Sequence, residues 1–199
     1  MPPRDLVLAS ASPARLGLLR AAGLAPQVLV SGVDEEAVTA DSCAELVLEL
    51  ARAKAHAVVG QAPPGALVVG CDSLLELDGE VLGKPGTPEV ALERWQRMRG
   101  RTGTLHTGHC VLDTASGREA ARTAGTTVRF GAPTDDELAA YVASGEPLGV
   151  AGGFTLDGRS APYVDGIDGD PGNVIGLSLP LLRALLAELG TPIHALWAA

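Results

Sequence analysis

The change of pattern inside "LVLASASPARLGLLRAAGL", residues 6–24, constrains the fold more than any other stretch. Residues 6–10 are apolar and β-prone, which is typical of a central strand in a parallel sheet. Ser12 then offers a helix N-cap, Pro13 suits the first helical position, and leucines at helical spacing follow until Gly23. A strand that leads directly into a capped helix predicts an α/β architecture.

The rest of the chain alternates helical and strand patterns without a regular βαβ repeat. Apolar residues recur at helical spacing in residues 43–59, 87–100, 133–145 and 178–190. Strand patterns begin at residue 27 and fill residues 66–71, 104–114 and 125–132, and Asp78-Gly79 predicts a hairpin turn. Trp95 and Met98 fall on the apolar stripe of their helix and are expected in the core. We therefore expect a mixed sheet with flanking helices, folded as a single domain over residues 1–199.

Composition and charge exclude several classes of partner. The chain has 199 residues, a net charge of −9 and no cluster of Lys and Arg, so polymeric nucleic acid is not an expected partner. No uncharged apolar run reaches about 18 residues, so no membrane span is expected. Three scattered cysteines, without a CxxC pair or a signal peptide, predict a reduced cytoplasmic protein.

The junction at residues 10–15 has the chemistry of an anion site. A helix N-terminus presents unpaired N–H groups and the positive end of the helix dipole. At the carboxyl end of a strand it binds anions, and Ser10, Ser12 and Arg15 would add two hydroxyls and a guanidinium. The alternative is that Ser12 only caps the helix and Arg15 only meets solvent.

One carboxylate and two lysines are further candidates. Asp72 directly follows the buried run 66–71, a common place for a catalytic carboxylate, but it also suits a turn that caps the hairpin. Lys54 interrupts an Ala-rich helix away from its apolar stripe, and Lys84 precedes Pro85, which keeps it extended. Each lysine alone is more often a solvated surface charge, so these residues matter only if they converge.

A metal site is suggested at one place and rejected at another. The acidic loop Asp34, Glu35 and Glu36 offers the oxygen ligands that Mg²⁺ prefers, although a solvated loop is the commoner reading. His106 and His109 stand three apart on a strand and face opposite sides, so they do not predict a zinc site.

Several motifs together resemble the Maf family of nucleotide pyrophosphatases. "LASASPARLGLL" is similar to the family signature LASxSPRRxxLL. "VDEE", "LARAKAHAV" and "GCDSLLELDGEVLGKP" follow in the family's order, as do "TVRFGAPTDDELAAYVASGEPLGVAGGF" and "NVIGLSLPLL". The resemblance implies a mixed α/β fold with two lobes around a central cleft, similar to inosine triphosphate pyrophosphatases. It also implies house-cleaning hydrolysis of a nucleoside triphosphate, modified ones included, to the monophosphate and pyrophosphate, with Mg²⁺ or Mn²⁺ as cofactor.

The resemblance also assigns roles to residues. Asp72 corresponds to the proposed general base, with Lys54 and Lys84 as the catalytic cations that neutralise phosphate charge. Ser10 and Arg15 correspond to phosphate ligands, and Glu35 is a metal-site residue that would act with Asp72.

Two departures from the family pattern bear on binding. Ala14 stands where the signature has its first arginine, which leaves one guanidinium in the loop. Asp157 in "TLDG" stands near a glutamine of one family branch, and a carboxylate there favours a base rich in donors, such as guanine. Asp157 equally suits a position facing solvent or the metal.

A second function fits the same resemblance. The family is also associated with septum formation, so the alternative is a nucleotide-binding regulator of cell division with little catalytic activity. The presence of Asp72, Lys54 and Lys84 together favours an enzyme, because a pure binder needs no general base. Whether the chain forms a homodimer is left open.

Overall fold

The computed structural model describes residues 4–198, which divide into two compact units. Of the described residues, the first unit contains 4–72, 107–124 and 176–198, and the second contains 73–106 and 125–175. Three strands pass from one unit into the other: β3 (Leu67–Leu77), β5 (Thr102–Asp113) and β6 (Glu119–Phe130). The single domain over residues 1–199 stays a prediction.

In the first unit, a parallel pair of strands lies next to β3. The strand β1 (Leu6–Leu8) pairs in parallel with β2 (Gln27–Val28) and with β3, and Leu8 lies opposite Val69. The strand order in this unit is β2-β1-β3-β5-β6. The helices of the unit are α1 (Pro13–Ala21), α2 (Cys43–Val58) and α6 (Leu179–Glu188), with 3₁₀ turns at Glu35–Ala37, Val59–Gln61 and Ile193–Leu196.

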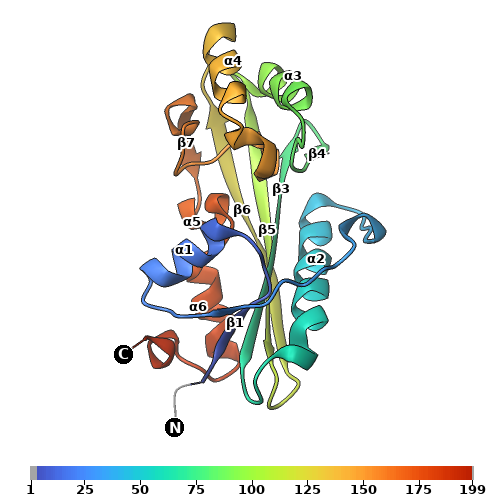
Figure 1. The fold of residues 1–199 in the computed structure, drawn as a ribbon, viewed down its shortest axis with the longest axis vertical. Coiled ribbons are helices and arrows are strands. Elements are labelled where there is room, and N and C mark those ends of the chain that lie inside the picture. Colours follow the sequence, from blue (N-terminus) through green and yellow to red (C-terminus); the bar gives the residue numbers. More distant parts are fainter. Residues whose placement is uncertain (1–3, 199) are drawn as a thin grey trace. The chain divides into compact units, whose positions relative to one another are not determined.

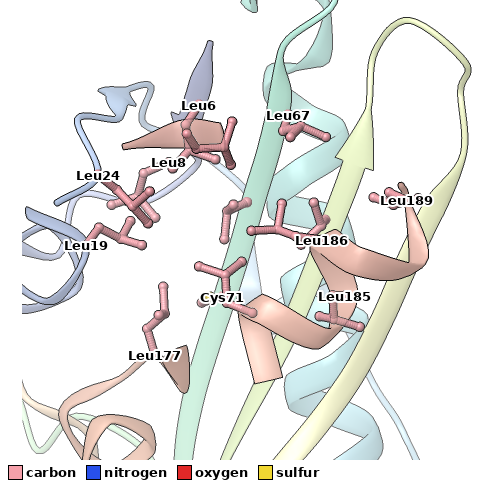
Figure 2. Close-up of a cluster of buried hydrophobic side chains, with 14 of the residues drawn as sticks. Leu6, Leu8, Leu19, Leu24, Leu67, Cys71, Leu177, Leu185, Leu186 and Leu189 are labelled. Atoms are coloured by element: carbon pink, nitrogen blue, oxygen red, sulfur yellow. The ribbon is translucent and has the colours of Figure 1, made fainter. Parts of the chain in front are cut away.

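Alternation along β3 divides the core of the first unit into two layers. Val69 and Cys71 join the leucines of α1 and α6, as Figure 2 shows for Cys71, Leu186 and their neighbours. Val68 packs instead with Ala51 and Ala55 of α2. Successive side chains of a strand point to opposite faces, so α2 covers one face of this sheet while α1 and α6 cover the other (Figure 1).

The second unit is built around a buried tryptophan. Its elements are β4 (Glu80–Leu82), α3 (Pro88–Met98), α4 (Asp135–Ala143), β7 (Val164–Asp168) and α5 (Pro171–Ile175), with 3₁₀ turns at Glu146–Gly149, Ala151–Gly153 and Ala161–Tyr163. Trp95 is fully buried, donates to the carbonyl of Gly153 over 2.8 Å, and packs edge-to-face against Phe130 and Tyr141. Met98 is also fully buried, so both core predictions are confirmed.

The predicted fold class is confirmed. The sheet is mixed, because β1 pairs in parallel while β3–β4 and β6–β7 are antiparallel. Asp78 and Gly79 both have positive φ, 52° and 81°, so the predicted two-residue hairpin turn between β3 and β4 is present.

The lengths of the strands differ from the prediction. β3 continues past Asp72 to Leu77, so Asp72 lies inside a strand and does not cap the hairpin. The strand continues because Leu75 and Leu77 are fully buried and alternate with less buried residues, a period-2 pattern that the polar pair Asp72-Ser73 obscures. β5 and β6 begin before the predicted ranges 104–114 and 125–132, at Thr102 and Glu119, and end inside them, at Asp113 and Phe130.

Among the described residues, no helix combines the length and the apolar character that crossing a membrane requires. Cys43, Cys71 and Cys110 are all buried, and none of these three described residues is in a disulfide.

Candidate functional site

The start of α1 holds its polar side chains close together. Ser12 is the N-cap of α1, and its Oγ accepts from the backbone N of Arg15 over 3.4 Å. Arg15 is buried, and its guanidinium donates from Nε to the carbonyl of Gly176 over 2.8 Å and from Nη1 to Ser10 Oγ over 3.1 Å. The capping role of Ser12 is therefore confirmed, and the alternative that Arg15 only meets solvent is wrong.

The hydroxyl of Ser10 is oriented by its neighbours. Its Oγ accepts from the backbone N of Ser12 over 3.2 Å and from Arg15 over 3.1 Å. A serine hydroxyl has two lone pairs and one proton. Both lone pairs are engaged, and within residues 4–198 this hydroxyl donates to no acceptor. The proton of this hydroxyl is therefore available for a further hydrogen bond.

A second group joins one ammonium to two carboxylates. Lys54 Nζ lies 2.5 Å from Asp72 Oδ1 and 2.6 Å from Glu35 Oε1. Lys54 and Asp72 are only 7% and 6% exposed, whereas the Glu35 side chain is half exposed. The reading of Lys54 as a solvated surface charge is therefore wrong.

The buried face of α2 differs from the predicted stripe. Ala51, Lys54 and Ala55 are buried, although Lys54 was expected away from the apolar stripe, and Ala57 is exposed. Alternating alanines along this helix fit either face, so the hydrophobic pattern did not fix its rotation. Lys54 consequently projects from the face of α2 that covers the sheet, on the same side of β3 as Asp72.

The two groups are attached to adjacent strands, β1 and β3. Ser10 follows β1 by two residues, and Leu8 of that strand lies opposite Val69, three residues before Asp72. Burial raises the pKa of the Cys71 thiol to about 11, while Arg15 and Lys54 lower it and Asp72 raises it. Charged residues of both groups therefore shift the pKa of the Cys71 thiol. In the first unit the structure joins Ser10 and Ser12 with Arg15, and Lys54 with Glu35 and Asp72.

The remaining candidates belong to the second unit. Lys84 is exposed and follows β4. Asp157 is exposed, and its Oδ1 accepts from the hydroxyl of Thr155. Ser160 fixes this loop because its Oγ accepts from Thr155 N over 2.9 Å and donates to Thr155 O over 3.0 Å. The roles of Lys84 and Asp157 stay predictions.

The acidic loop has one member that reaches the buried lysine. Asp34 caps the 3₁₀ turn by accepting from Glu36 N over 3.2 Å, while Glu35 turns to Lys54. Glu35 and Asp72 already share one cation, and carboxylate oxygens are the donors that Mg²⁺ and Mn²⁺ prefer. These residues therefore fit a divalent metal.

Sequence reasoning missed the partner of Arg15. The acceptor is the backbone carbonyl of Gly176, 161 residues away in the chain. The Gly-rich segment before α6 signals a turn, but no residue pattern reveals which carbonyl meets a distant guanidinium.

The first unit is that of an α/β protein with a capped helix N-terminus and a buried guanidinium at the carboxyl end of a central strand. Residues 5–189 match the family described as Maf-like protein, and the chain belongs to this family. This membership confirms the resemblance of the sequence motifs.

Several close relatives of this chain carry the same name. A protein from Streptomyces coelicolor, named nucleoside triphosphate pyrophosphatase, is 73% identical over 99% of this chain and 96% of its own length. A protein of the same name from Streptomyces avermitilis is 66% identical over 98% of this chain and 96% of its own length. Another, from Mycobacterium sp. (strain JLS), is 53% identical over 96% of this chain and 97% of its own length. Among solved structures, the Staphylococcus aureus Ham1 protein matches with a TM-score of 0.45 and 13% identity, over 64% of this chain and 72% of that one.

Proposed function

We propose that this protein is a nucleoside triphosphate pyrophosphatase, which hydrolyses a ribo- or deoxyribonucleoside triphosphate to the monophosphate and pyrophosphate. The buried Lys54–Asp72 pair, together with the Ser10–Arg15 group of the same unit, carries the proposal. A desolvated pair of charged groups is a candidate functional site, and the helix N-terminus of the same unit supplies groups that bind anions. The names of the relatives support the same reaction.

The phosphate groups bind at the start of α1. Ser10 donates a hydrogen bond from its hydroxyl, and Arg15 adds its charge. Ser12 caps the start of the helix, where unpaired backbone N–H groups face the anion. Lys54 neutralises phosphate charge from the other side, and Lys84 is proposed for the same task. Phosphoryl-type transfer depends mainly on such positioning and charge neutralisation.

Asp72 is the proposed general base. It takes a proton from the attacking water, the new P–O bond forms at the α-phosphorus, and the bond to the bridging oxygen breaks so that pyrophosphate leaves. Lys54 Nζ, 2.5 Å from Oδ1, holds the carboxylate in one orientation for this step.

Glu35 and Asp72 are the residues proposed to hold a divalent cation, Mg²⁺ or Mn²⁺. When bound, such an ion neutralises phosphate oxygens and makes water more acidic. Activity that is lost on chelation and restored by either ion tests this assignment.

Asp157 is proposed to select the base. One of its carboxylate oxygens accepts from Thr155, and within the described part of the chain the other, Oδ2, has no hydrogen bond. A free carboxylate oxygen pairs with donors, which favours guanine-type bases over those that present acceptors. The three free cysteines fit the cytoplasm, where nucleoside triphosphates are found.

The test is pyrophosphate release from a panel of standard and modified nucleoside triphosphates, with Mg²⁺ or Mn²⁺. We expect one pyrophosphate per monophosphate and no release of single phosphate. Asp157→Asn should change the ranking of bases, while Asp136→Asn, an exposed acidic residue of α4, should not. Tight binding of a nucleotide without any release would favour the regulator of cell division instead.

A further inference from the structure

Two glycines lie where the backbone of α2 comes closest to the sheet. A Cβ added at Gly70 of β3 would lie 2.1 Å from the carbonyl oxygen of Ala51 and 2.8 Å from the amide nitrogen of Ala55. A Cβ at Gly108 of β5 would lie 2.0 Å from the carbonyl oxygen of Val47. Each of these contacts is to helix backbone, which cannot rotate away as a side chain can. Any other residue at either position must push α2 off the sheet.

The contact at Gly70 lies beside the ion pair. Gly70 precedes Asp72 by two residues, so both face α2. Ala51 precedes Lys54 by three residues on the helix, which places the two on one side of α2. The point of closest approach between helix and sheet is therefore next to the Lys54–Asp72 pair.

The contact at Gly108 adds a second constraint. Val47 and Ala51 are four residues apart on α2, so the two glycines meet successive turns of one helix face. A single contact fixes the separation at one point and leaves the helix free to tilt. Two contacts, on the neighbouring strands β3 and β5, fix both the separation and the tilt.

We propose that Gly70 and Gly108 are positioning residues, which set the separation of α2 from the sheet at which the Lys54 ammonium reaches the Asp72 carboxylate. The effect of the two glycines on the separation of α2 from the sheet does not depend on the proposed function, whereas their effect on turnover rests on it. Lys54 is shared by Asp72 and Glu35, so it cannot follow one carboxylate without losing contact with the other.

The expected displacement is large enough to matter for catalysis. A methyl group at Gly70 must recede from 2.1 Å to an ordinary contact distance, which moves α2 by about 1 Å or more. A misplacement of about 1 Å at a reacting group costs about 100-fold in rate. We therefore expect Gly70→Ala to lower kcat about 100-fold and to change KM much less.

The first experiment measures the geometry. Crystal structures of Gly70→Ala and Gly108→Ala are compared with the wild type and with Gly60→Ala, where an added Cβ meets nothing within 4 Å. The proposal expects the Lys54 Nζ to Asp72 Oδ1 distance to lengthen in both variants and to stay short in the control. An unchanged distance in folded Gly70→Ala overturns it. If neither variant folds, the glycines serve the fold alone, and the positioning role is withdrawn.

The second experiment separates positioning from general destabilisation. Asp72→Glu adds one carbon–carbon bond of reach, about 1.5 Å. In the wild type it should lower kcat, whereas in Gly70→Ala it should raise kcat, because the longer side chain reaches the displaced lysine. Equal losses in the two backgrounds would overturn the proposal. A wild type that releases no pyrophosphate would contradict the proposed function, and the crystallographic distance would then decide this inference by itself.

Discussion

Arg15 donates to Ser10 Oγ over 3.1 Å and to the carbonyl of Gly176 over 2.8 Å, so one buried guanidinium ties the end of β1 to the segment before α6. This relationship gives Arg15 a task that its charge alone does not perform. It orients the Ser10 hydroxyl and holds a distant backbone segment at the same time.

Arg15→Lys should weaken both binding and stability. Lysine carries the charge as a single compact group and cannot direct two hydrogen bonds as a planar guanidinium does. A buried Gly176 carbonyl left without its donor costs about 1–3 kcal/mol in the free energy of unfolding. We expect KM for the triphosphate to rise about tenfold, the equivalent of about 1.4 kcal/mol. Urea unfolding and steady-state kinetics measure the two effects.

Arg20→Lys is the matched control, because Arg20 is an exposed residue in the last turn of α1. It should leave both quantities near their wild-type values. Equal effects at positions 15 and 20 would contradict the role given to Arg15.

Lys54→Met should destabilise the fold. The substitution leaves Asp72 buried without its cation, and removal of one member of a buried ion pair costs about 3–5 kcal/mol. Lys54→Met combined with Asp72→Asn should cost less than the sum of the single changes, because the unpaired charge is then absent.

Urea unfolding of the four proteins gives the coupling free energy. Lys84→Met is the control, since Lys84 is exposed and its loss should change stability by no more than about 0.5 kcal/mol. Strict additivity of the Lys54 and Asp72 changes would show that the pair is not coupled.

The buried thiols should resist ionisation. Burial raises the pKa of Cys71 to about 11 and, with the Glu119 charge, that of Cys110 to about 12. A free cysteine has a pKa near 8.5. A raised folded-state pKa stabilises the fold below the unfolded value, and this stabilisation is lost as the pH rises towards about 11–12.

Thiolate absorbance near 240 nm and alkylation by iodoacetamide at about pH 8.5 test the thiols, since an ordinary cysteine is half ionised there. We expect little reaction of Cys71 and Cys110 in the folded protein and full reaction of all three cysteines in urea. Rapid alkylation of folded Cys71 at that pH would contradict its burial beside Asp72.

Ala14→Arg tests the departure from the family signature. Ala14 is half-buried in the first turn of α1, next to Arg15. A second guanidinium there should lower KM for the triphosphate several-fold and leave kcat little changed, because it adds charge without touching the general base. Gly17→Arg, one turn further along α1, is the control for added charge alone.

Local features of the fold were predictable from sequence, and long-range ones were not. The turn at Asp78-Gly79 and the N-cap at Ser12 depend on residues within a few positions of one another, and both are present. The end of β3 was misplaced because polar residues continue a strand whose alternate residues are buried.

For the site, the sequence identified the residue types but not their contacts. Lys54 and Asp72 were candidates, yet their pairing depends on the rotation of α2, which alternating alanines leave undetermined. The contact of Arg15 with Gly176 joins segments 161 residues apart, so only the folded chain reveals it. The chemical roles proposed for the site residues came from the resemblance of the motifs to a family, because hydrophobic periodicity indicates burial and not chemistry.

The central claim is that Asp72 acts as the base in a pyrophosphate-releasing hydrolysis. Its most direct test compares wild type and Asp72→Asn for pyrophosphate release from the best nucleoside triphosphate, at saturating substrate and metal. Asparagine keeps the shape of the side chain but cannot accept a proton from water. We predict that nucleotide binding persists while kcat falls at least about 100-fold, the lower range for loss of a general base. Near-normal turnover by Asp72→Asn would contradict the account.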